Sequence, residues 1–262
     1  VDALLAAEAT LPEPRDMVVP SRIVRMPLAF DASTTLEAIR KYQQSVRDAA
    51  PWLPSNIEFI RRINGLDSAD QVRETIFKAN YMVMGLGDVY LGAPCAVPTD
   101  PRHRLVTTKY NPARTWTAEG EVGIGGVYMC VYGMESPGGY QLVGRSVPVW
   151  NTYRRTAEFQ PGHPWLLRFF DQVQFYPMEE AELNVYREQF RRGEVSLDIE
   201  ETTFRVKDYH DFLNQEQDDI ATFRQQQQAA FEIEREAWVR DGSAELAPVA
   251  EEPPVDVDSV VV

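Results

Sequence analysis

Hydrophobic and polar positions along the first third of the chain change from the spacing of a strand to the spacing of helices. Residues 21–30 alternate apolar and polar side chains, which predicts a β-strand. Three helices should follow it, because Thr34, Ser55 and Ser68 each precede a Glu or Gln by three residues, the spacing of a capping box. A second strand is predicted over residues 81–86, so this part of the chain has the pattern of a small α/β unit.

The middle of the chain has a different pattern, in which short apolar runs are separated by turn residues. From residue 86 to 177, stretches rich in β-branched and aromatic side chains are interrupted by proline, glycine and asparagine. Many short strands of this kind predict a barrel or a sandwich. Residues 164–175 fit a strand, a tight turn and a second strand that would complete it.

Helical spacing returns after Pro177. Residues 180–191 predict a short charged helix, residues 194–206 a strand, and residues 208–240 one long helix. That helix would reach about 50 Å, at about 1.5 Å per residue, which is longer than a domain of this size needs. It either braces the rest of the chain with one apolar face, which we favour, or extends as an arm that contacts a partner.

Composition narrows the class of protein. The chain has 262 residues, 44% of them hydrophobic, enough for one large core or two modest ones. Its formal net charge of −14 argues against nucleic acid or an anionic membrane as the main partner. No apolar run approaches the ~20 residues of a membrane span. Cys95 and Cys130 lie in apolar surroundings, as expected of buried thiols rather than a disulfide in a reducing cytosol, and no Cys/His cluster has the spacing of a metal site.

Residues 120–145 combine strand-forming side chains with a high density of glycine. Residues 122–126 are Val-Gly-Ile-Gly-Gly, and residues 136–145 are Ser-Pro-Gly-Gly-Tyr-Gln-Leu-Val-Gly-Arg. Glycine weakens a strand unless a backbone, a bulge or a ligand must come close, so a tight barrel corner and a ligand site are both open. These residues resemble the signature of the family called allophanate hydrolase subunit 1. The same module forms the second half of the carboxyltransferase domain of urea carboxylases.

The resemblance implies an α+β fold, a cyclophilin-like β-barrel with a small α/β subdomain and a long C-terminal helix. Five segments are expected along the chain: a lead-in, the α/β subdomain, the barrel, a helix–strand–long-helix extension, and an acidic, proline-containing linker or tail. Their bounds are residues 1–19, 20–85, 86–177, 178–242 and 243–262.

The implied function is half of the carboxyltransferase of a biotin-dependent urea carboxylase, which moves CO2 from carboxybiotin to a urea nitrogen and forms allophanate. Residues 85–92 (Gly-Leu-Gly-Asp-Val-Tyr-Leu-Gly) and 206–232 resemble urea carboxylases more than the smaller regulatory relatives. The chain has no Ala-Met-Lys-Met-like attachment sequence, so a separate carrier domain should hold the biotin. A companion N-terminal half and a biotin carboxylase are the other implied partners. Guanidine as the acceptor is an alternative, and so is a non-carboxylating subunit related to 5-oxoprolinase and kinase-inhibitor subunits.

Four candidate catalytic residues lie in the signature stretch: Gly138, Gly139, Tyr140 and Arg145. The reaction develops an oxyanion on the ureido ring of biotin, and backbone N–H groups of a glycine turn together with a fixed guanidinium suit its stabilisation. For Arg145, a structural salt bridge at the end of a strand is an equally open role.

Three further residues are candidates for binding the substrate: Asp88, Tyr90 and Ser136. The Asp88 carboxylate can accept two N–H bonds from urea or guanidinium, although a turn leading into a strand would also explain an aspartate there. The hydroxyl of Ser136 either binds a ligand carbonyl or only starts the turn. All these residues are expected to meet at the glycine-lined mouth of the barrel.

The segment of residues 100–114 concentrates positive charge in an otherwise acidic chain. Its cations are Arg102, Arg104, Lys109 and Arg114. They either face the carboxyl group or the acidic rim of a carrier domain, or are solvated loop charges. Between two of these arginines, His103 should have a lowered pKa.

Overall fold

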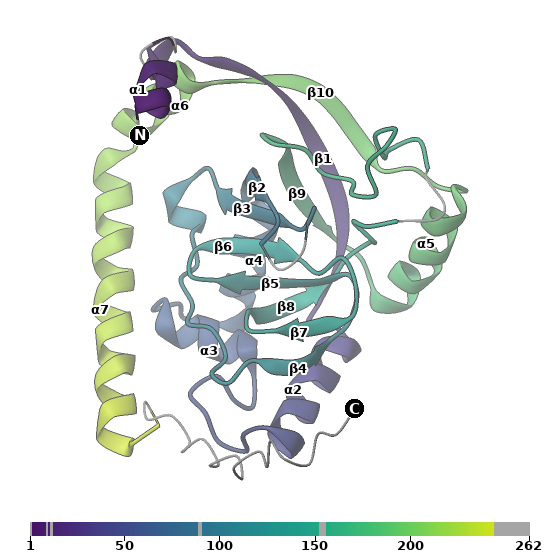
Figure 1. Cartoon of the computed structure of the whole chain (residues 1–262). Helices are drawn as coiled ribbons and strands as arrows, with labels where there is room; N and C mark the ends of the chain where they lie inside the picture. The colour runs from purple at the N-terminus through teal and green to yellow at the C-terminus, as the bar shows by residue number, and fades with distance from the viewer. Residues whose placement is uncertain (1, 9, 11–12, 89–90, 152–155, 244–262) are drawn as a thin grey trace, which may run out of the picture.

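Ten strands carry the fold of the chain, which is described by a computed structural model apart from residues 1, 9, 11–12, 89–90, 152–155 and 244–262. The strands are β1 (Val18–Phe30), β2 (Asn80–Leu86), β3 (Pro94–Pro98), β4 (Arg114–Thr117), β5 (Glu121–Gly125), β6 (Tyr128–Val131), β7 (Ser136–Gly138), β8 (Gln141–Arg145), β9 (Gln172–Pro177) and β10 (Asp198–Arg205). In the described part they form an eight-stranded sheet in the order β10-β1-β8-β5-β6-β3-β2-β9 and a small sheet of β4 and β7 (Figure 1).

Helices connect and flank these strands. They are α1 (Asp2–Glu8), α2 (Ser33–Ser45), α3 (Asn56–Ile63), α4 (Ala69–Lys78), α5 (Glu180–Arg192), α6 (Val206–Gln215) and α7 (Gln217–Asp241), with short 3-10 turns η1 (Pro14–Asp16) and η2 (Pro101–His103). In the described part of the chain, no helix has both the length and the apolar character needed to cross a membrane.

β1 is the longest strand and pairs with three others. Its first half is antiparallel to β10, the segment Ile23–Leu28 is parallel to β9, and its last two residues are antiparallel to β8. Because β9 also pairs with β2, the order of hydrogen-bonded strands returns to β1. Pro27 lies between the residues that pair with β10 and those that pair with β8, where the missing proline N–H interrupts neither ladder, and its carbonyl accepts the hydroxyl of Ser146 at 2.6 Å.

The main core lies on one face of these strands. Val122 and Ile124 of β5 and Met129 and Val131 of β6 are buried in it, together with β1, β9, α4 and α5 side chains. Successive side chains of a strand point to opposite faces, so the residues between these four point away from the main core. A second, aromatic cluster under α3 contains Tyr42, Trp52, Phe59, Ile63 and Tyr110.

At two of the three predicted helix starts the serine N-cap is confirmed. The hydroxyls of Ser55 and Ser68 accept the backbone N–H of Glu58 and Gln71, each at 3.2 Å. The prediction for Thr34 was wrong: α2 begins at Ser33, and its preceding residue makes no side-chain cap. The Thr34 hydroxyl instead donates to the carboxylate of Glu121 in β5. Thr34 therefore bonds a buried carboxylate that is distant in sequence, Glu121, instead of the backbone at the start of its own helix.

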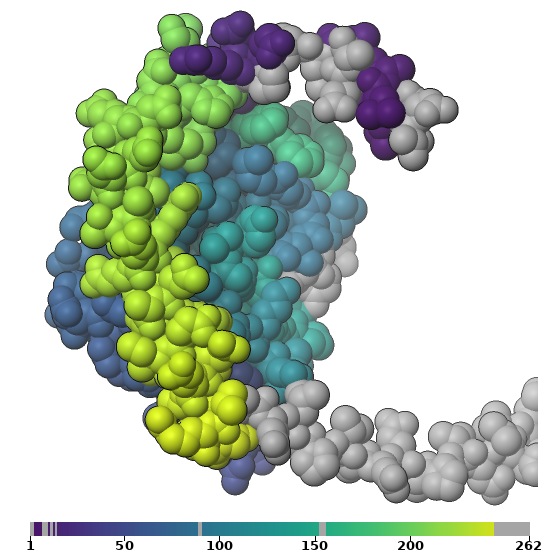
Figure 2. All heavy atoms as spheres, turned by 90° about the vertical axis from the view of Figure 1, so that its left-hand side faces the viewer, coloured from purple at the N-terminus to yellow at the C-terminus, as the bar shows by residue number. Residues whose placement is uncertain are grey.

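The predicted single C-terminal helix is two helices, because the chain bends at Glu216 between α6 and α7. Arg102 of η2 binds the Glu216 carboxylate at 2.8 Å and fixes the bend. α7 runs along one side of the molecule (Figures 1 and 2), where Trp238 packs 5.7 Å from the ring of Phe59 in α3. This packing agrees with a bracing role.

Most of the other predicted elements are present. β1, β2, α5 and β10 occur where strands and a helix were predicted. In the predicted strand pair over residues 164–175 only β9 forms, because Trp165 makes an isolated bridge to Trp150 and Phe170 turns the chain with φ 66°. Strands from three predicted segments share one sheet, and the segment boundaries stay a prediction.

Candidate functional site

The glycines of β5 make room for an aromatic ring of the chain itself. Gly123 and Gly125 point away from the main core, toward Tyr140. A Cβ on Gly123 would lie 2.9 Å from the Cβ of Tyr140, and one on Gly125 would overlap the ring. Tyr140 is only 4% exposed, so the ring cannot be displaced cheaply. The glycines of β5 were expected where another group comes close to the strand, and that group is the side chain of Tyr140.

Gly138 has the same relation to a second tyrosine. The hydroxyl of Tyr132 occupies the place where a Cβ on Gly138 would lie, and the Tyr132 side chain is fully buried. A Cβ on Gly139 would meet only ordinary contacts, the nearest being the Cβ of Lys109 at 3.5 Å. The Gly139 carbonyl accepts the N–H of Tyr110 at 2.6 Å. Tyr132 was not found from the sequence, although it follows Cys130 by two residues and lies directly after the end of β6.

Two predicted site residues from distant stretches meet on this face. Asp88 and Tyr140 lie close enough to interact: burial first, and then the hydrogen-bonding and charge interaction with Asp88, raise the pKa of Tyr140 above its usual range. The loop that carries Asp88 is closed by a hydrogen bond from the N–H of Gly87 to the carbonyl of Ala93 at 2.7 Å. Tyr90 lies outside the described residues.

Several buried side-chain oxygens of Asp88 and of the signature stretch have no protein partner in the described part of the chain. They are Asp88 Oδ2, the Tyr132 hydroxyl, Ser136 Oγ and Gln141 Oε1. A buried polar atom without a partner costs about 1–3 kcal/mol, so such atoms are normally bonded to water or a ligand. Carboxylate and amide oxygens accept N–H groups, and a hydroxyl can also donate to a carbonyl, so these atoms suit a small ligand that carries both N–H and C=O groups.

Two further groups border the pair. Cys95 of β3 has its pKa raised by burial first and then by Asp88, while Lys109 lowers it. The ammonium of Lys109 lies over the ring of Tyr140, 4.8 Å from its centre. We call Asp88, Cys95, Lys109 and Tyr140 the outer-face cluster. It lies on the face of β3, β5 and β6 that is turned away from the main core. The expected location at the mouth of a barrel stays a prediction.

The other cations of the basic segment have structural partners. Arg102 pairs with Asp100 at 2.8 Å, and Arg104 donates to the carbonyl of Pro98 at 2.9 Å. His103 has a lowered pKa, as predicted, although burial is the first cause and Arg102 a smaller one.

Arg114 is buried behind the signature stretch and only 1% exposed. Its guanidinium donates to the carbonyl of Tyr140 at 2.6 Å and to the hydroxyl of Thr117 at 3.2 Å, and lies over the ring of Tyr110. It therefore holds the backbone on which Tyr140 is placed.

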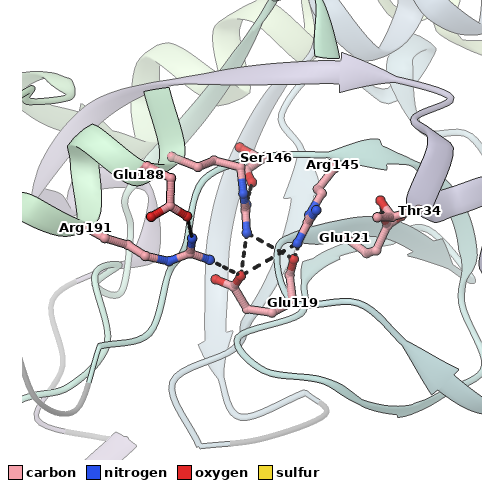
Figure 3. Close-up of polar contacts among 8 residues, drawn as sticks. Thr34, Glu119, Glu121, Arg145, Ser146, Glu188 and Arg191 are labelled. Atoms are coloured by element: carbon pink, nitrogen blue, oxygen red, sulfur yellow. Dashed lines mark hydrogen bonds and ion pairs between the residues drawn. The ribbon is translucent and has the colours of Figure 1, made fainter. Parts of the chain in front are cut away.

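Arg145 lies in a separate cluster (Figure 3). It is five residues beyond Tyr140, roughly 16 Å along a strand, and its Nε donates to the carbonyl of Glu119 at 3.0 Å. The Glu119 carboxylate also binds Arg187 and, at 2.8 Å, Arg191, both from α5. The structure thus shows the salt-bridge role for Arg145 and does not bring it to Asp88. A cavity of about 630 Å³ opens beside Glu119 and Arg191.

Glu121 is a buried carboxyl group that the sequence analysis did not single out. It is fully buried and accepts the hydroxyls of Thr34 and, at 2.7 Å, of Thr35 at the start of α2. Burial raises the pKa of Glu121 to about 7, and the two threonine hydrogen bonds oppose this rise.

Comparison with known proteins places these features in context. A sequence model of the carboxyltransferase domain, subdomains C and D, matches residues 2–160. The chain is 43% identical to the urea amidolyase of Lachancea kluyveri over 267 residues, and 42% identical to that of Saccharomyces cerevisiae over 243 residues. These alignments cover 99% and 93% of this chain but 14% and 13% of the relatives. The crystal structure of Kluyveromyces lactis urea carboxylase superposes with a TM-score of 0.82 and 43% identity, covering 96% of this chain and 22% of that one.

Proposed function

This chain belongs to the carboxyltransferase family, in the part called subdomains C and D, and from that premise we propose that it forms half of the carboxyltransferase of a biotin-dependent urea carboxylase. The likeness to urea amidolyases extends over 99% of the chain, including the C-terminal extension, which favours this function over a smaller regulatory subunit. The reaction breaks the bond between the carboxyl carbon and a ureido nitrogen of biotin, joins that carbon to a urea nitrogen, and moves one proton from that nitrogen to biotin.

One observation carries the proposal: a buried carboxylate oxygen without a protein partner, Asp88 Oδ2, lies beside the Tyr140 hydroxyl. Asp88 accepts the N–H groups of urea, and Tyr140 holds that carboxylate in place. The Ser136 hydroxyl and the backbone of Gly138 and Gly139 bind the ureido oxygen, where negative charge develops. Biotin supplies the carboxyl group when its carrier domain brings it here.

The remaining candidate residues have other roles. Arg145 fastens the end of β8 to α5 through Glu119, which gives the sheet its position relative to that helix. Tyr90 follows Asp88 by two residues and is assigned to the substrate on its position in sequence alone.

The ring of strands is the cyclophilin-like barrel that the resemblance implies. The pairing of β1 with both β8 and β9, and the main core that these strands share, support this description. The partners are a companion N-terminal half, a biotin carboxylase and a carrier domain, since the chain spans only 14% of the length of the urea amidolyase that it matches. Cys95 and Cys130 form no disulfide, which agrees with a cytoplasmic location.

The test uses the chain together with its carboxylase, biotinyl carrier and companion half. ATP turnover should depend on added urea, and Asp88→Asn should lower urea-dependent turnover at least tenfold, because an amide offers one acceptor oxygen instead of two. Asp67→Asn is the control, at an exposed helix-start residue. If ATP turnover by the wild-type assembly does not change when urea is added, the proposal is ruled out. Guanidine is tested in parallel, because its planar cation fits the same carboxylate.

A further inference from the structure

We infer that Lys109 is the group that binds the carboxylate of the carboxylated substrate, while Asp88 binds its amide end. The inference rests on the proposed function and deepens it, because it assigns a second charged contact to the same site. It follows from comparing the interaction partners of the four cations in residues 100–114, which are Arg102, Arg104, Lys109 and Arg114.

Three of those cations are already engaged. Arg102 binds two carboxylates, at Asp100 and Glu216, and cannot leave them without freeing the bend between α6 and α7. Arg104 is held by a backbone carbonyl and by the hydroxyl of Tyr209 at 3.0 Å. Arg114 is buried beneath the Tyr140 backbone, so a ligand arriving from solvent cannot reach its guanidinium.

Lys109 differs from all three. Its side chain is exposed, and no carboxylate of the described residues forms an ion pair with its ammonium. The ring of Tyr140 lies beneath the ammonium, and the lysine stem packs against Gly139. An aromatic face attracts a cation without neutralising it, so the charge is held in one place and is still available to an anion.

The two charged groups next to Tyr140, Asp88 at its hydroxyl and Lys109 over its ring, match the product of the proposed reaction. An N-carboxylated urea has N–H groups at one end and a carboxylate at the other. Asp88 attracts the first and repels the second, and Lys109 does the reverse. Both interactions favour one orientation, in which the carboxylate lies over the Tyr140 ring on the solvent side.

Binding of two stable probes to this chain tests the inference without the assembled enzyme. Malonamate has an amide and a carboxylate, and malonamide replaces that carboxylate with a second amide. By calorimetry, the wild-type chain should bind malonamate about tenfold more tightly than malonamide, as expected of one charge-assisted contact near the surface. Added salt should reduce this preference, because it screens exposed charges.

Lys109→Met should abolish the preference for malonamate and leave malonamide binding unchanged, whereas Lys109→Arg should restore most of it. Lys41→Met is the matched control, because Lys41 also lies over an aromatic ring, that of Trp116, but is paired with Glu37. Equal binding of the two probes by the wild-type chain, or a preference that survives Lys109→Met, would overturn the inference. Neither result bears on the proposed function, which fails only if the wild-type assembly shows no urea-dependent ATP turnover.

Discussion

Replacing Glu121 with glutamine should stabilise the chain increasingly as the pH rises. The ordinary pKa of a glutamate is 4.5, and burial raises that of Glu121 to about 7 in the folded state. The folded chain therefore holds one more proton than the unfolded chain between these values, so its stability falls as the pH increases through this range. The difference between the two pKa values corresponds to a loss of about 3 kcal/mol of unfolding free energy, most of which occurs between pH 5 and pH 8. A glutamine does not ionise, so the variant avoids this loss.

The measurement is urea denaturation of both proteins at several pH values from 5 to 8, followed by tryptophan fluorescence. The quantity of interest is the difference in unfolding free energy between Glu121→Gln and wild type, since other titrating groups cancel in it. This difference should rise by about 2–3 kcal/mol from pH 5 to pH 8, whatever the amide itself costs at Thr34 and Thr35. Glu236→Gln, at an exposed position on α7, should show no such rise. A difference that is flat or falls with pH would refute the account of a protonated, buried carboxyl group.

Two further substitutions test the packing described above. Gly125→Ala should lower the free energy of unfolding by about 1–3 kcal/mol, because the new methyl group overlaps the Tyr140 ring, and most of this cost should vanish when Tyr140 is also replaced by alanine. If the cost is the same in both backgrounds, Tyr140 is not the reason for this glycine. Arg187→Met should cost about 3 kcal/mol in the same denaturation assay, because it leaves the carbonyl of Ser146 and part of the Glu119 charge unbonded. A cost below about 1 kcal/mol would show that Arg145 and Arg191 suffice to hold Glu119.

The sequence predicted the helix N-caps correctly where no partner from a distant part of the chain competes for the capping side chain. Ser55 and Ser68 cap the helices that their spacing predicts, since the partner is three residues away in each case. Thr34 has the same spacing but faces the buried carboxylate of Glu121, which is 87 residues away. The bend at Glu216 likewise depends on Arg102, which no periodicity could connect to it.

The residues of the candidate site likewise fall into those that the sequence identified and those that it did not. Asp88 and Tyr140 were each identified by resemblance, and the pairing of β3, β6, β5 and β8 then brings them together. Arg145 belongs to the same signature, yet the length of β8 carries it to the Glu119 cluster. Tyr132 and Glu121 were missed because an isolated polar or aromatic side chain within an apolar run looks like ordinary core until its burial is known.

The three partners of β1 impose an order on folding. This strand lies near the start of the chain, whereas β8, β9 and β10 are made more than 110 residues later. During synthesis on the ribosome, β1 cannot pair with β9 until about residue 177 has emerged, or with β10 until about residue 205 has emerged. Contacts this distant in sequence make folding slow and leave unpaired strand edges open to aggregation in the meantime. A chain truncated before β9 keeps that hazard permanently, so nascent and shortened forms of this protein should depend on chaperones more than the finished one does.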